Sequence, residues 1–240
     1  MIIKTGLVLA ALLSSAAAFS QKMDAFDGHV ADYRLLHYPG VEAEIHVSTA
    51  QRAQMNAAQD RERTIVNAYL VQVQRTGKSA QELARDPKYL GFLMDLQHAI
   101  LSTLSPPQLK RLRELSLQAV GVAGVLDVIV SKRIGMSDVQ LKKARTVYGD
   151  AVKRERVIVG LVNRQVQAKY MTTRVATETE KKALNDRMQR DREAAMKTKK
   201  PELDQIEAQT KRDLKAVLTA KQLAAYQALQ GKMFLPKRAK

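Results

Sequence analysis

The sequence predicts an all-α protein: a duplicated helical unit with long amphipathic helices, packed as an antiparallel or bent bundle. Three observations lead to this fold class. A helix-start motif recurs four times, apolar residues are spaced three and four apart, and these features follow in the same order in both halves of the chain. Aromatic residues make up only 5% of the chain and Trp is absent, so the core must consist of Leu, Val, Ala, Ile and Met.

The helix-start motif is an apolar residue, then Ser or Thr, then Gln three positions after the hydroxyl residue. The hydroxyl accepts a backbone N–H of the first turn, and the Gln side chain reaches back to the backbone of the capping residue, which makes a capping box. Each cap contributes about 1 kcal/mol to stability, so the motif specifies helix starts rather than chemistry. Its four copies have the capping pairs Ser48 and Gln51, Ser105 and Gln108, Ser137 and Gln140, and Thr219 and Gln222.

The first helical unit is expected over residues 37–124, after a segment at 19–36 that shows no clear period. Apolar residues at three- and four-residue spacing predict a long helix from Ser48 to a glycine C-cap at Gly77. Further helix starts are expected at Ser79, at Asp86-Pro87 and at Ser105, and Gly121 is expected to end the last helix.

The second unit is expected over residues 125–231, followed by a basic tail at 232–240. An amphipathic stretch from Leu141 to Tyr170 predicts a helix about 50 Å long. Residues 177–200 predict a polar helix with a narrow apolar stripe. Pro201 is expected to break this helix and to open the next one, since proline favours the first helical turn.

Residues 1–18 have the features of a secretory signal peptide. Lys4 supplies the positive charge, an apolar run follows, and Ala16-Ala17-Ala18 offers a cleavage site. The run is shorter than the roughly 20 residues that span a bilayer, so we expect an exported protein, periplasmic or secreted, without a transmembrane span in the mature chain. Cys is absent, so neither disulfides nor a lipid-modified Cys can form.

The formal net charge is +16, and most of it lies in the second half. Residues 125–240 carry 27 Lys and Arg against 13 Asp and Glu, whereas residues 1–124 carry 13 against 11. A basic half indicates an acidic or anionic partner, although a simply solvated helical surface gives the same pattern. The residues expected to bind a client or an anion are Lys142, Lys143, Arg145, Lys181, Lys182, Arg187, Arg190 and Arg192.

Catalytic and cofactor motifs are not found in the sequence. No Gly-rich phosphate loop and no nucleophile elbow occur, and the absence of Cys excludes thiol catalysis. Four His occur without metal-ligand spacing; His29, His37 and His46 with Asp32 are the only metal-ligand candidates, and dispersed surface His is the favoured interpretation. We therefore expect no enzyme, no cofactor and no metal. Few aromatics lie between the basic residues, which argues against specific nucleic-acid binding.

The recurring motif in an exported helical chain resembles the LTxxQ-motif proteins, which include the Spy-like periplasmic chaperones. Leu104-Ser105-Pro106-Pro107-Gln108 and Leu218-Thr219-Ala220-Lys221-Gln222 carry the resemblance best. It implies a long, bent, all-α structure, often dimeric, whose amphiphilic basic surface holds unfolded clients without ATP. With four motifs in about twice the length, the chain also resembles larger exported proteins that carry several such motifs.

Three functions remain open on this basis. The first is an ATP-independent periplasmic chaperone or stress adaptor that binds unfolded or acidic proteins. The second is a basic binder of anionic envelope polymers, such as lipopolysaccharide or cell-wall polymer. The third and most remote is a metal-responsive sensor, a branch of the same family whose ligands are not recognisable in this sequence.

Overall fold

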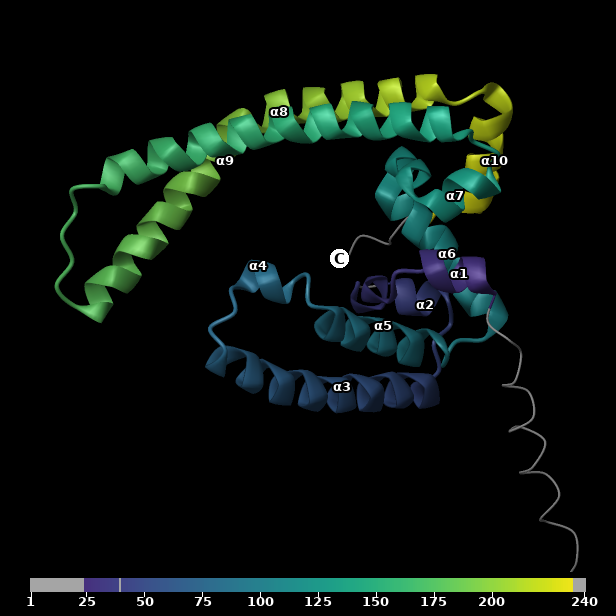
Figure 1. The fold of residues 1–240 in the computed structure, drawn as a ribbon. Helices are drawn as coiled ribbons and strands as arrows, with labels where there is room; N and C mark the ends of the chain where they lie inside the picture. The colour runs from purple at the N-terminus through teal and green to yellow at the C-terminus, as the bar shows by residue number, and fades with distance from the viewer. Residues whose placement is uncertain (1–23, 39, 235–240) are drawn as a thin grey trace, which may run out of the picture. The chain divides into compact units, whose positions relative to one another are not determined.

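The structure is a computed structural model that describes residues 24–38 and 40–234. The predicted signal peptide at 1–18, with its cleavage site, lies outside these residues, as does the end of the basic tail from 235. Within the described ranges every regular element is a helix, which confirms the all-α prediction. The described chain divides into two compact units, one up to Ala119 and again from Leu229, the other Val120–Ala228. Figure 1 shows the helices of both units.

Unit 1 begins with short helices and continues with longer capped ones. Asp24 caps the first helix and Asp32 caps the second, so the stretch at 19–36 that lacks a sequence period contains helical turns. The predicted starts at Ser48, Ser79 and Asp86 are confirmed by their cap hydrogen bonds. The elements are α1 (Ala25–Val30), η2 (Tyr33–His37), α2 (Val41–Glu44), α3 (Thr49–Arg75), α4 (Ala80–Leu83), α5 (Pro87–Leu101) and α6 (Pro106–Val120).

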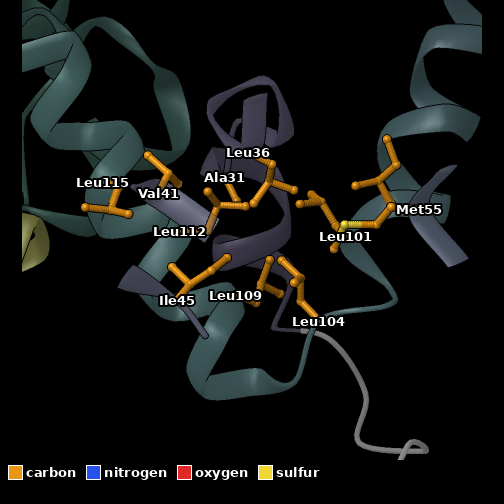
Figure 2. Packing of buried hydrophobic residues seen from close by; sticks show 11 residues of the cluster. Ala31, Leu36, Val41, Ile45, Met55, Leu101, Leu104, Leu109, Leu112 and Leu115 are labelled. Carbon is orange, nitrogen blue, oxygen red and sulfur yellow. The ribbon is translucent and has the colours of Figure 1, made fainter. Parts of the chain in front are cut away.

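The core of unit 1 is aliphatic, as the composition requires. Figure 2 shows Leu109, Leu112 and Leu115 of α6 among apolar side chains from the N-terminal helices, α3 and α5. This spacing of three places one face of α6 in the core, where Leu112 is fully buried. Burying one such leucine contributes on the order of 2 kcal/mol. α3 and α5 pack side by side at this core.

The end of the described chain returns to unit 1. The buried Arg113 of α6 pairs with Asp27 through Nε at 2.9 Å and donates to the Leu229 carbonyl. The backbone N–H of Phe234 donates to Gln118 at 2.9 Å, and its ring packs against the core. Residues 232–234, the first three of the predicted basic tail, are therefore held in place.

Unit 2 is dominated by two long helices. It contains η3 (Gly121–Leu126), α7 (Val128–Arg133), α8 (Asp138–Tyr170), α9 (Glu178–Val217) and most of α10 (Ala220–Gln230), whose last two residues belong to unit 1. α8 has 33 residues, close to the predicted length. α8 and α9 pack antiparallel along Ala151, Ile158 and Ile206, in agreement with the predicted amphipathic period. Tyr226 of α10 is buried and donates to the Gly121 carbonyl, and burial raises its pKa.

The predicted break at Pro201 is wrong, because α9 runs through it as one bent helix (Figure 1). Proline removes one backbone hydrogen bond and bends a helix, yet it does not end one whose flanks are held. The ion pairs Lys199–Glu202 and Lys200–Asp204 cross the proline at 3.1 and 2.7 Å. Beyond it, Leu203 and Ile206 pack against α8. Tertiary packing therefore outweighs the local signal.

Candidate functional site

The two motif copies of unit 1 meet through their glutamines. Nε2 of Gln51 donates to Oε1 of Gln108 at 2.7 Å, and Nε2 of Gln108 donates back to Oε1 of Gln51 at 3.1 Å. Each Oε1 also accepts the backbone N–H of its own capping serine, Ser48 or Ser105, at 3.0 and 2.9 Å. We call this reciprocal amide pair, with its two caps, a glutamine clasp. It joins the starts of α3 and α6.

Unit 2 contains a second glutamine clasp with the same hydrogen bonds. Gln140 donates to Gln222 at 2.8 Å, and Gln222 donates back at 3.0 Å. Their Oε1 atoms accept from the backbone N–H of Ser137 and of Thr219 at 3.0 and 2.9 Å. The recurrence is what an internal repeat predicts; descent by duplication stays a prediction.

Each clasp also fixes a tight turn through a second amide hydrogen. Gln108 donates to the His46 carbonyl at 2.9 Å, and Gln222 donates to the Gly135 carbonyl at 2.7 Å. Both acceptors have left-handed backbone, with φ of 56° at His46 and 76° at Gly135. Glycine adopts this conformation without strain, whereas the same conformation is strained for a residue with a Cβ, such as His46. All four glutamine side chains thus serve the fold, which leaves no free group for chemistry.

The predicted basic residues lie on the two long helices of unit 2, and their side chains are exposed. Lys142, Lys143 and Arg145 belong to the first turns of α8, where Arg145 also donates to the Leu126 carbonyl at 3.2 Å. The other five occupy the first part of α9. Of these, Lys181 makes an exposed ion pair with Glu178 at 3.4 Å. Such pairs contribute little to stability, so these charges remain available to a partner. The α9 set is Lys181, Lys182, Arg187, Arg190 and Arg192.

One carboxylate within this basic region ties α9 to the end of α8. Asp191 pairs with Lys169 and accepts the hydroxyl hydrogen of Tyr170 at 2.8 Å. The Lys169 ammonium, and after it the Tyr170 hydroxyl, hold the pKa of Asp191 below its usual range. Asp191 therefore anchors the basic stretch of α9 to α8.

Apolar side chains lie between the bases on the solvent side of α8. Val157 is 59% exposed and Leu161 is 49% exposed. Arg154 precedes Val157 by three residues and Arg164 follows Leu161 by three, and both are exposed. Residues at these spacings share one helix face. The four residues Arg154, Val157, Leu161 and Arg164 form what we call the α8 amphiphilic stripe.

The histidines do not form a metal site in the described part of the chain, where no three His, Asp or Glu side chains are grouped closely enough to hold an ion. His37 lies 3.5 Å from the Gln59 amide, and the His46 backbone serves the clasp. Asp32, the remaining candidate ligand, pairs with Arg34 at 2.8 Å.

Among the described residues, no helix is both long and apolar enough to cross a membrane.

Comparison of the chain with family models, with curated proteins and with solved structures gives no match. The resemblance to the LTxxQ-motif proteins stays a prediction carried by the motif alone.

Sequence reasoning found the caps but missed the clasp. A signal for it is present, because the four motif copies all have Gln where Glu would cap equally well. The boxes that stand outside a clasp, Ser79–Glu82 and Thr177–Glu180, have Glu. A carboxylate only accepts, whereas the clasp needs two amide donors from each side chain.

Proposed function

We propose that this protein is a non-enzymatic interaction protein, an ATP-independent chaperone or stress adaptor of the periplasm. Its second unit binds flexible segments of unfolded proteins that combine acidic and apolar residues. The observation that carries the proposal is the α8 amphiphilic stripe, where Val157 and Leu161 stand exposed between Arg154 and Arg164.

The stripe suits a two-step capture. The bases of α8 and α9 attract an acidic chain over about one Debye length, roughly 10 Å at 0.1 M salt. Contact with the exposed valine and leucine then slows release, because apolar area leaves water. Each step is weak at a single site, so a client can dissociate and refold without ATP.

A second candidate, binding of an anionic envelope polymer, is favoured by α9. There the five exposed bases accompany apolar side chains that are only half-buried, such as Leu184 and Met188. Charge alone suffices for this function, so its binding should vanish in high salt. A metal-responsive sensor has no supporting site among the described residues.

The test is suppression of the aggregation of an unfolded model protein at low and high salt. Val157→Ser with Leu161→Ser should weaken suppression at both salt concentrations, since it removes apolar contact and keeps the charge. The matched control is Ile65→Ser with Val71→Ser. These two apolar residues of α3 have similar exposure, 45% and 51%, but they lie in the less basic half of the chain, so their replacement should leave suppression unchanged. Equal suppression by wild type and the Val157/Leu161 variant, with complete loss in salt, would favour the anionic polymer.

A further inference from the structure

The exposed side of α8 carries an eleven-residue repeat. Lys142, Arg145 and Gly149 are followed at the same spacing by Lys153, Arg156 and Gly160, and Arg164 begins a third copy. The intervening residues also match in part, since Lys143 corresponds to Arg154. All the basic residues of the repeat are exposed.

Helix geometry places equivalent residues of the two copies on one line. Eleven residues make close to three full turns, so each copy is displaced by only about 20° around the axis and by about 16.5 Å along it. Ala151 and Ile158 lie two residues from the glycines, almost half a turn away, and are buried. The glycines and bases therefore face away from the packed side of α8.

The fold gives no reason for the two glycines. Neither has a positive φ, and a Cβ built at Gly149 or Gly160 would meet nothing within 4 Å. Glycine inside a helix weakens the helix relative to alanine. A residue that weakens the fold and meets no neighbour is expected where something else approaches the backbone.

The first copy borders a surface hollow of about 510 Å³ whose basic lining is Lys142, Arg145 and Lys153. Gly149 and Leu141 also line it, together with Thr146 and the carboxylates of Asp138 and Asp150, so the bases outnumber the acids by three to two. Arg145 donates one of its N–H groups to the Leu126 carbonyl, and Lys153 pairs with Asp150 at 2.9 Å. Both contacts are solvent-exposed, and the Lys153 pair is one that a ligand carboxylate can replace at little cost. Lys142 has no hydrogen bond or ion pair through its side chain in the described residues.

We propose that α8 holds two carboxylate-binding subsites at equivalent positions of the repeat, Lys142 with Arg145 and Lys153 with Arg156, each beside a glycine with open space around it. The occupant is an extended acidic polypeptide segment. An extended chain advances about 3.3 Å per residue, so five residues cover the 16.5 Å between subsites. Adjacent side chains point to opposite sides, so a pair of neighbouring acidic residues always presents one carboxylate to α8. Two such pairs that start five residues apart place same-side carboxylates four or six residues apart, about 13 or 20 Å, and the long Lys, Arg and Glu side chains span the remaining difference of about 3.3 Å. The inference rests on the proposed function and specifies which client segments bind.

The test uses fluorescence anisotropy with three labelled peptides that share one length. One carries a single Glu-Glu pair, one carries four contiguous Glu, and one carries two Glu-Glu pairs whose starts are five residues apart. The spaced peptide should bind the wild-type protein about tenfold more tightly than the single-pair peptide, because the second contact is intramolecular. It should also bind more tightly than the contiguous peptide, which has the same charge. Equal or tighter binding of the contiguous peptide would overturn the tandem site.

Two variants separate the site from bulk charge. Lys153→Gln with Arg156→Gln should lower the affinity for the spaced peptide to that for the single-pair peptide. The control, Lys215→Gln with Lys221→Gln, removes the same charge from exposed positions elsewhere in unit 2 and should keep the preference for the spaced peptide. Gly149→Gln with Gly160→Gln should abolish the preference while the protein melts no lower than wild type. Retention of the preference in this glycine variant would show that the two glycines play no part in the site. If wild type suppresses aggregation without distinguishing the peptides, the tandem site fails and the proposed function stands.

Discussion

Replacing Gln222 by Glu tests the glutamine clasp with almost no change of shape. Gln222 is 8% exposed and donates to the Gly135 carbonyl at 2.7 Å and to Gln140 at 3.0 Å. A carboxylate keeps the hydrogen bonds that Oε1 accepts and loses both that Nε2 donates. Two lost hydrogen bonds cost about 1 kcal/mol each, and the carboxylate then faces the oxygens of Gly135 and Gln140 with no proton between them, so we expect a total loss of roughly 2–4 kcal/mol at neutral pH.

The pH dependence of this variant has a defined sign. Burial and two facing oxygens should raise the pKa of the new carboxyl in the folded state above about 4.3, its unfolded value. The protonated carboxyl restores one donor, so the deficit should be smallest below about pH 4 and should grow as pH rises through the folded pKa. This loss in the free energy of unfolding is measured at each pH by urea denaturation, followed by circular dichroism. The control variant is Gln227→Glu, which makes the same substitution at an exposed position of the same helix. Equal losses for the two variants at neutral pH would refute the clasp.

Four further substitutions follow from the structure. His46→Gly should raise the free energy of unfolding by about 0.5–1 kcal/mol, because glycine relieves the left-handed φ of 56°; a lower urea midpoint would contradict this. Ser105→Ala should lower it by roughly 1 kcal/mol, because the Ser105 hydroxyl no longer donates to Oε1 of Gln108 at 3.0 Å, and client binding should be unchanged; lost binding at unchanged stability would make the motif functional. Gly149→Ala should raise it by about 0.8–1 kcal/mol, and a lower melting temperature would reveal a hidden contact. Hydrogen bonds from Lys78 and Tyr69 hold the pKa of Asp86 well below its usual range, so their stabilisation is present above about pH 4 and is lost as pH falls further. Asp86→Asn should therefore destabilise the protein at neutral pH, and a deficit that does not narrow in acid would show another cause.

Much of the fold was predictable because its signals are local. A cap needs only a hydroxyl and a Gln or Glu three residues apart, and the long helix at 138–170 has an apolar period that only Glu155 interrupts. The prediction of a helix break at Pro201 was wrong because the effect of a proline depends on packing with residues far away in the chain. Leu203 and Ile206 pack against α8 and hold the helix beyond the proline. No local window contains that information.

The sequence predicted which residue types make up the basic surface of α8 and α9, but not how they are arranged in space. Charge counts identified the basic half, yet the exposure of Val157 and Leu161 depends on which side of α8 faces α9. Tyr148 lies four residues after Ala144 and three before Ala151, which are both buried, yet it is itself 42% exposed, so spacing alone does not decide burial. The Arg113–Asp27 pair was also missed, since it joins residues far apart in the chain and neither neighbourhood marks it.

The most direct test of the proposed function is stopped-flow binding of an unfolded acidic client at two ionic strengths. The variant replaces Lys181, Lys182, Arg187, Arg190 and Arg192 of α9 with Gln, which removes charge from exposed positions and should leave the fold intact. At low salt the variant should associate more slowly than wild type while its dissociation rate changes less, because exposed charge acts mainly on encounter. High salt should bring the two association rates together. Equal association rates at low salt would remove this basic surface from the mechanism.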